Sequence, residues 1–130
     1  MNKEEIFKKL RIDGNQKMLI INAPNEYLEI FLGINFDTES NGEGIYDFVQ
    51  VFGYQQDELE KLVQSVEKSG KYDCSFWACY PKGTGKVKSN IKRETVWTAF
   101  ELVGLQAVSQ IAIDETWSAL RGRPVEKVGK

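Results

Sequence analysis

The fold is decided by residues 46–80, which read YDFVQVFGYQQDELEKLVQSVEKSGKYDCSFWACY. Residues 46–52 and 72–80 are rich in aromatic and β-branched side chains, a composition typical of buried strands. The segment between them carries apolar residues at i, i+3, i+4 and i+7, starting from Leu59, so residues 57–69 are predicted as a helix. A strand, a helix and a second strand in this order predict a βαβ unit with two parallel strands.

The same reasoning extends outward from this unit. Asp57 and Glu60 resemble a capping box at the start of the central helix, and Gly70 is expected to end it as a C′ residue. Asn25 is expected to cap a short helix that stops near Gly33. Further strands are predicted at residues 17–22, 34–37, 105–113 and 117–121, and further helices at residues 3–10 and 91–103. The last of these helices is expected to turn Val96, Trp97, Phe100 and Val103 inward.

The last two predicted strands are joined by three or four residues, which is too few for a crossover, so this pair must be antiparallel. Helices are predicted between most of the other strands, and right-handed crossovers then place helices on both faces of the sheet. The sequence therefore predicts one α/β domain of three layers over residues 1–130, with a mostly parallel sheet and an antiparallel C-terminal hairpin strand. Residues 1–16 form an N-terminal helix and turn, residues 17–122 the core, and residues 123–130 a loose tail.

Composition excludes several classes of function. The 130 residues contain no His, which removes His-based catalytic triads and His metal sites. The formal net charge of −2 argues against nucleic acid as the main partner. No apolar run approaches a membrane span and the N-terminus lacks a signal-peptide core, so we expect a cytoplasmic protein without a membrane partner. Cys74 and Cys79 lie on opposite faces of one predicted strand and are expected to be buried free thiols.

Three pieces of the chain resemble the C-terminal half of a class I methyltransferase, which has a Rossmann-like fold. They are the strand opening with Tyr46-Asp47, the aromatic strand that closes in Pro81-Lys82, and the terminal hairpin. More closely, the chain resembles small bacterial proteins of a domain-of-unknown-function family. The likeness covers about residues 17–122 and adds Gly104-Leu105 and the segment 114–121, DETWSALR. The resemblance implies a Rossmann-like fold, but it implies no activity. We expect five parallel strands and one antiparallel strand near an edge, in the order 2-1-3-4-6-5.

The sequence departs from the methyltransferase pattern where S-adenosylmethionine would bind. The first strand ends in Asn22-Ala23-Pro24, without the Gly-rich turn that lets backbone approach a cofactor, and Pro24 lacks an N–H donor. Only Asp37 and Glu39 could supply the acidic ribose ligand after the second strand. We therefore predict no cofactor. The favoured function is a non-enzymatic binding or interaction module on a degenerate methyltransferase-like scaffold.

The alternative is a small-anion or nucleotide binder, with or without enzymatic activity, built on the loop 81–86. This loop contains two Gly between a strand and a helix, so its N–H groups and lysines could hold phosphate. It does not match a P-loop, because Tyr80 stands where the first Gly is needed and Val87 replaces Ser or Thr. A solvated connection is the competing interpretation.

Ligands of open α/β sheets bind outside the carboxyl ends of the strands, and this rule gives the candidate ligand-binding residues. They are Asn22, Pro81, Lys82, Gly83, Gly85, Lys86, Arg93 and Asp114, with Gly53 at the same edge. Asp114 or Thr116 is also expected to shape the hairpin turn, and Asp47 to hydrogen-bond a neighbouring loop. The sequence does not identify a partner, and the candidates that we expect are another protein or a small phosphorylated ligand. The basic run of Lys82, Lys86, Lys88, Lys92 and Arg93 leaves weak nucleic-acid contact as a third hypothesis.

Overall fold

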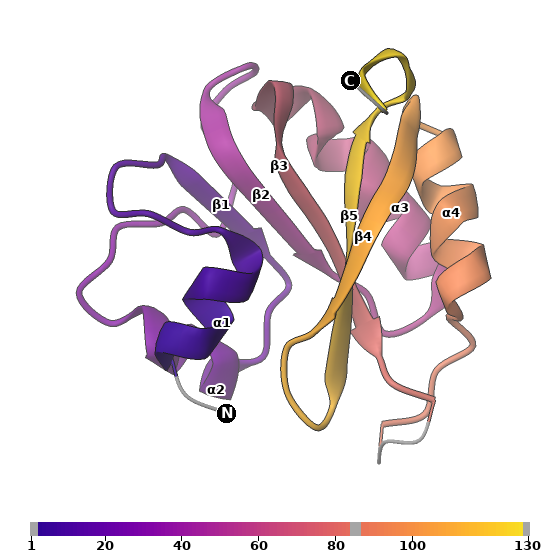
Figure 1. Ribbon diagram of the computed structural model, residues 1–130, viewed down its shortest axis with the longest axis horizontal. Coiled ribbons are helices and arrows are strands. Elements are labelled where there is room, and N and C mark those ends of the chain that lie inside the picture. The colour runs from indigo at the N-terminus through magenta and orange to yellow at the C-terminus, as the bar shows by residue number, and fades with distance from the viewer. Residues whose placement is uncertain (1–2, 84–86, 129–130) are drawn as a thin grey trace.

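The computed structural model describes residues 3–83 and 87–128. Its sheet has the strand order β1-β2-β3-β5-β4 (Figure 1). The parallel strands β1 (Met18–Ile21), β2 (Tyr46–Phe52) and β3 (Gly70–Pro81) are followed by β5 (Trp117–Pro124), which runs antiparallel to both β3 and β4 (Leu105–Ala112). The predicted α/β class, the mostly parallel sheet and the antiparallel hairpin strand are confirmed.

One predicted strand is missing from the described part of the sheet. Residues 34–37 contribute a single parallel bridge between Leu19 and Asp37, on the outer side of β1. Only the last residue of this segment reaches β1, where the Asp37 N–H donates to Met18 and the Ile20 N–H donates back to Asp37. The predicted order of the other strands is correct, and the predicted second strand is reduced to this one bridge.

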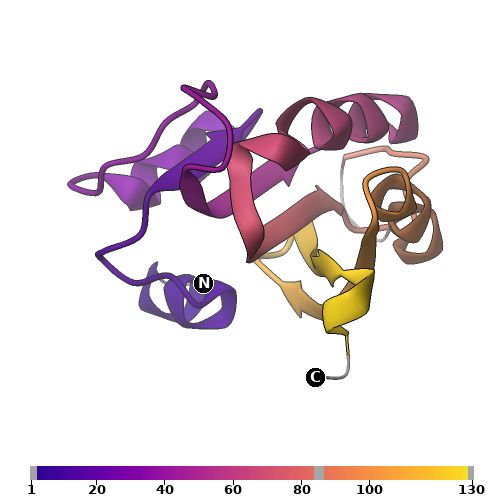
Figure 2. The same cartoon turned by 90° about the horizontal axis from the view of Figure 1, so that it is seen from above.

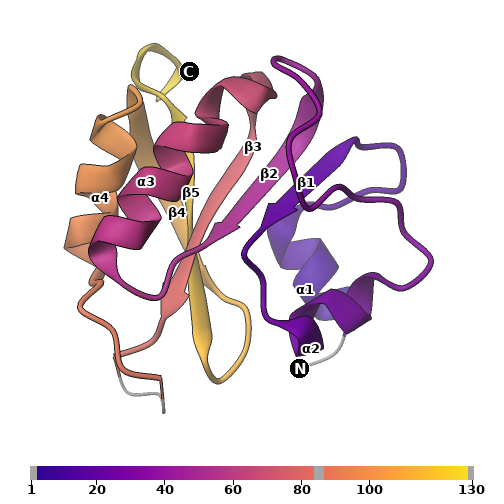
Figure 3. The same cartoon turned by 180° about the vertical axis from the view of Figure 1, so that it is seen from behind.

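Helices cover both faces of the sheet. On one face, α3 (Gln56–Val66) and α4 (Arg93–Glu101) lie side by side (Figure 3), with Leu59, Val63, Val96 and Phe100 fully buried. On the other face lie α1 (Lys3–Leu10) and the short helix α2 (Asn25–Leu28), which the 3₁₀ turn η1 (Glu29–Phe31) continues. Seen from above, α1 and α3 are on opposite sides of the sheet (Figure 2).

Successive strand residues alternate between the two cores, as the pleat requires. Val49, Val51, Phe76 and Ala78 face α3 and α4, whereas Phe48, Phe52, Trp77 and Cys79 face α1 and α2. Cys74 packs against the first core and Cys79 belongs to the second, so the two free cysteines do lie on opposite faces. Burial raises the pKa of Cys74 to about 12, which keeps this thiol protonated and unreactive near neutral pH.

Several local predictions were wrong, each for a physical reason. The predicted capping box of Asp57 and Glu60 does not form, because α3 begins earlier, with Gln55 as its cap, and both residues lie inside the helix. Glu58 accepts a hydrogen bond from the Tyr54 N–H at 2.6 Å. Gly70 has a φ of −76° and opens β3, since the 3₁₀ turn η2 (Glu67–Ser69) continues the helix. A Cβ on Gly70 would lie 2.5 Å from the Cys74 sulfur, so close packing explains this glycine.

Three further differences concern helix faces and ends. Trp97 is 49% exposed, because the inward face of α4 is taken by Val96, Ala99 and Phe100. Pro24 occupies the cap position of α2 and Asn25 is its first residue. The chain after residue 122 is less loose than predicted, since β5 continues to Pro124 and η3 (Val125–Lys127) follows. Among the described residues, no helix is long and apolar enough to cross a membrane.

Candidate functional site

The carboxyl ends of the parallel strands meet at the lower edge of the sheet in Figure 1. Asn22 and Gly53 follow β1 and β2, Pro81-Lys82 closes β3, and Asp114 lies just beyond β4. Arg93 begins α4, which runs back antiparallel to the strands, so it belongs to the same edge. The fold thus brings these predicted residues to one edge. Gly85 and Lys86 lie outside the described residues.

The ends of β1 and β2 are joined by their own polar groups. Asn22 has a φ of +62°, and its side-chain amide donates to the Phe52 carbonyl at 2.8 Å. The Gly53 N–H donates to the Cys79 carbonyl at 3.0 Å. A Cβ on Gly53 would lie 2.6 Å from the Leu59 Cβ, so α3 packs directly on this turn. These groups hold the sheet edge together.

Aromatic side chains fill the space above these two strand ends. The Tyr27 ring lies 4.9 Å from Phe52 and 5.3 Å from Phe31, and Trp117 contacts Phe52 at 5.0 Å, all between ring centroids. Tyr54 packs on Trp117 at 5.1 Å. All except Tyr54 are at most 5% exposed. We call these five residues the aromatic cluster.

A buried polar chain anchors the aromatic cluster to the sheet. The Tyr27 hydroxyl donates to Gln50 Oε1 at 2.9 Å, and Gln50 Nε2 donates to the Cys79 sulfur at 3.3 Å. Burial raises the pKa of Tyr27 well above its usual value, and Gln50 is itself fully buried. Because each of these polar groups has a partner, the cluster is a satisfied part of the core.

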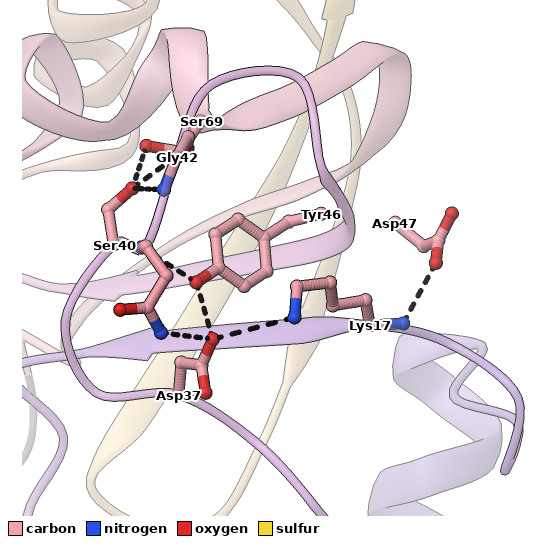
Figure 4. A network of polar contacts seen from close by, with 8 residues as sticks. Lys17, Asp37, Ser40, Gly42, Tyr46, Asp47 and Ser69 are labelled. Atoms are coloured by element: carbon pink, nitrogen blue, oxygen red, sulfur yellow. Dashed lines mark hydrogen bonds and ion pairs between the residues drawn. The ribbon is translucent and has the colours of Figure 1, made fainter.

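Asp37, a sequence candidate for a ribose ligand, is held at the other end of the strands (Figure 4). Its carboxylate accepts hydrogen bonds from the Tyr46 hydroxyl and from Asn41 Nδ2, and Lys17 Nζ lies 3.9 Å away. The Tyr46 and Asn41 donors lower the pKa of Asp37. In the same view Asp47 accepts from the Lys17 N–H at 2.8 Å, as predicted for this residue. These contacts fasten the loop 38–45 and the start of β1 to β2.

A hollow of about 360 Å³ lies on the α4 side of the sheet edge. Lys82, Gly83 and Arg93, three of the predicted residues, line it together with Tyr80, Gln110 and Ser118. Gln110 Nε2 donates to the Tyr80 hydroxyl at 3.2 Å. Burial raises the pKa of Tyr80, and the positive charge of Arg93 partly offsets this.

Ser118 is the least expected residue of this hollow. It is 7% exposed, and its hydroxyl makes no hydrogen bond with any described residue. The rule for strand ends did not select Ser118, Tyr80 or Gln110. The available signal was the antiparallel hairpin, since the register Tyr80↔Ser118 and Gln110↔Leu120 follows once β5 is placed between β3 and β4.

Asp114 and Pro81 serve the hairpin. Asp114 Oδ1 accepts from the N–H groups of Thr116 and Trp117, both at 2.8 Å, so this carboxylate shapes the turn as predicted. Pro81 pairs with Trp117, and the Lys82 N–H donates to the Thr116 carbonyl at 2.8 Å. A second, more acidic hollow of about 520 Å³ lies beside this turn, lined by Glu5, Lys82, Asp114, Glu115 and Thr116.

No family model matches the sequence, and a comparison with curated proteins finds no match. Among solved structures, the chain is similar to a SAM-dependent methyltransferase from Aquifex aeolicus, with 12% identity, a TM-score of 0.60, and coverage of 92% of this chain and 88% of that one. It is also similar to magnesium protoporphyrin IX methyltransferase from Synechocystis PCC 6803, at 11% identity, a TM-score of 0.59, and 94% and 82% coverage.

A third similar structure is 1,6-didemethyltoxoflavin-N1-methyltransferase from Burkholderia thailandensis, at 8% identity, with a TM-score of 0.58 and coverage of 94% of this chain and 76% of that one. Identities this low establish the architecture alone. Together with the strand order and the terminal hairpin, they show that the chain has the Rossmann-like fold of class I SAM-dependent methyltransferases.

Proposed function

We propose that the chain is a binding module on a methyltransferase-like scaffold that does not use S-adenosylmethionine. One observation carries the proposal: the aromatic cluster occupies the space over the carboxyl ends of β1 and β2. The connection after β1 leads to the bridge on its outer side, whereas β2 lies on its inner side. Ligands of open α/β sheets bind at such a reversal of strand order, and aromatic side chains packed at this place support a scaffold that works without a cofactor.

The turn after β1 supports the same proposal. Pro24 caps α2 and has no N–H group that could bind a ligand. The side-chain amide of Asn22 already donates a hydrogen bond to the Phe52 carbonyl. Making room for a cofactor at this place would expose Tyr27, Phe31 and Phe52, which are at most 5% exposed. Loss of a fully buried aromatic side chain from a core costs roughly 3–5 kcal/mol, and contacts with a cofactor would have to offset a cost of this order.

The test is isothermal titration calorimetry of S-adenosylmethionine and S-adenosylhomocysteine into the purified protein. We expect no saturable heat and no rise in the melting midpoint, whereas a ligand at 100 times its Kd would stabilise the fold by ~2.7 kcal/mol. A cofactor-binding methyltransferase treated identically is the positive control. Saturable binding of either compound, or methyl transfer to any acceptor, would refute the proposal.

A second candidate function is the binding of a small anion in the hollow between Lys82 and Arg93. Ser118 favours it, because this residue is 7% exposed and lines a hollow together with three cations, Lys82, Lys92 and Arg93, and one carboxylate, Glu94. Arg93 is engaged only weakly, with its Nη2 3.9 Å from Glu94. Positive side chains beside a hydroxyl and a helix start are the donors that phosphate oxygens accept from.

Mutagenesis tests this second function. Replacing both Lys82→Ala and Arg93→Ala should weaken the binding of nucleotides or phosphorylated metabolites by at least about tenfold, because each cation supplies a charge-assisted contact. The melting midpoint should not change, since neither side chain is buried. Lys88→Ala is the matched control, because Lys88 lies nearby without lining the hollow. Unchanged affinity in the double variant would exclude the hollow as the site.

A further inference from the structure

Three arginines from distant parts of the chain gather on the face of the sheet that carries α1. Arg11 follows the last residue of α1, and Arg121 and Arg123 project from β5 on the same side as Ala119 of the second core. All three line a hollow of about 480 Å³, with Ser109 of β4 and an apolar wall of Ala107, Val108 and Val128.

The positive charges of this group, which we call the arginine cluster, are mostly uncompensated. Arg123 is paired with Asp73, with Nε and Nη2 at 2.9 and 2.8 Å from the two carboxylate oxygens. Within the described part of the chain, Arg11 and Arg121 have no carboxylate within ion-pair distance. Three guanidinium groups therefore share one carboxylate, in a chain whose formal net charge is −2.

Arg121 carries a buried hydrogen-bond donor, its Nε, that has no partner among the described residues. Burial, followed by the charges of Arg11 and Arg123, lowers the pKa of Arg121. A buried donor without a partner and a cation beside like charges both cost free energy, so a native structure normally supplies a water or an anion at such a place.

Backbone geometry fixes two of the arginines. Arg11 has a φ of +59°, and this left-handed position is held by its N–H to the Lys8 carbonyl and by the Ile12 N–H to the Phe7 carbonyl. Arg121 pairs with Ser109 at a register shift between Ala107 and Ser109 of β4. Bulges of this kind redirect side chains and are common beside binding sites. The arrangement is therefore set by the fold and not by flexible side chains alone.

We propose that the arginine cluster is a binding site for the phosphate group of a small phosphorylated ligand, which Arg11 and Arg121 hold from two sides. The planar guanidinium fork matches the oxygens of a phosphate in a bidentate manner. Arg123 stays with Asp73 and adds positive potential at the rim, and the Ser109 hydroxyl is a further donor lining the hollow. This site lies on the opposite face of the sheet from the hollow of Lys82 and Arg93, and it does not depend on the proposed function.

The test is calorimetric titration of pyrophosphate into the full chain in a phosphate-free buffer. We expect saturable binding that Arg11→Gln and Arg121→Gln each weaken by about ten- to a hundredfold, the usual effect of removing one charge-assisted contact. The matched control is Lys61→Gln, which removes one exposed positive charge from α3, lines neither hollow and should bind pyrophosphate as the wild type does. Pyrophosphate should also raise the melting midpoint of the protein, and sodium chloride at the same ionic strength should not.

Several results would overturn the site. They are the absence of saturable binding at millimolar pyrophosphate, wild-type affinity in both arginine variants, and equal stabilisation by sodium chloride. Loss of binding only in the Lys82 and Arg93 variant would move the anion to the other face and support the second candidate function instead. Arg11 is exposed, so Arg11→Gln keeps the test valid even if Arg121→Gln disturbs folding.

Discussion

Asp47 shows how a single carboxylate in an apolar strand serves structure. It accepts the Lys17 N–H at 2.8 Å and lies 2.8 Å from Lys71 Nζ. These two donors, the backbone one first, lower the pKa of Asp47 below its ordinary value of 3.8. The folded state thus binds this proton less readily than the unfolded chain, so the contribution to stability is present above the unfolded pKa and is lost as the pH falls through the folded pKa.

This sign gives a prediction at the scale of one residue. Asp47→Asn should lower the free energy of unfolding at pH 7 and should flatten its fall between about pH 5 and pH 2, relative to the wild type. Urea unfolding followed by tryptophan fluorescence at a series of pH values measures both effects. Glu39→Gln is the control, since Glu39 is exposed and has no partner among the described residues. Parallel pH profiles for Asp47→Asn and the wild type would contradict the assignment.

The turn between β2 and α3 carries the prediction at the scale of an element. A Cβ on Gly53 would lie 2.6 Å from the Leu59 Cβ and 3.0 Å from the Leu59 Cα, so Gly53→Ala forces the helix away from the strand end. Overpacking of this kind typically costs roughly 1–3 kcal/mol. The matched control is Gly14→Ala, where a Cβ would meet nothing within 4 Å. Urea unfolding should separate the two variants, and equal stability would show that the turn adjusts freely.

Elements with a local signal could be predicted from the sequence. The apolar spacing of Leu59, Val63 and Val66 identified α3, and the short link between Ile113 and Trp117 required an antiparallel hairpin. Whether residues 34–37 form a strand could not be predicted in this way, because it depends on how many residues after η1 lie alongside β1, and only Asp37 pairs there. The orientation of Trp97 could not be predicted either, because it depends on which face of α4 packs against the sheet, and that face carries Val96 and Phe100.

The candidate sites were predictable only where they follow strand ends. Topology brings Lys82 and Arg93 to one edge, and the rule for open α/β sheets found them. The aromatic cluster brings α2 together with Trp117 of β5, which is distant in the sequence. The arginine cluster likewise brings residue 11 together with residues 121 and 123. No spacing in the sequence signals such contacts, because they arise from tertiary packing and from the twist of the sheet.

At the scale of the whole molecule, one sheet separates two independent cores. Ile6 of α1 is 4% exposed in the core on one face, and Val63 of α3 is fully buried in the core on the other. Among residues 3–83 and 87–128, no buried side chain belongs to both cores. Substitutions at sites without shared partners usually have additive effects on stability.

The resulting prediction uses one conservative truncation in each core. Ile6→Val should cost roughly 0.5–1.5 kcal/mol, and Val63→Ala should cost somewhat more because it removes more buried hydrocarbon. The double variant should equal the sum of the two within about 0.5 kcal/mol, with an unchanged urea m-value, since the fold should still unfold as one unit. A coupling above about 1 kcal/mol would mean that the sheet transmits packing changes between its faces. Ligand binding on one face would then alter affinity on the other, and the two hollows could no longer be treated as separate sites.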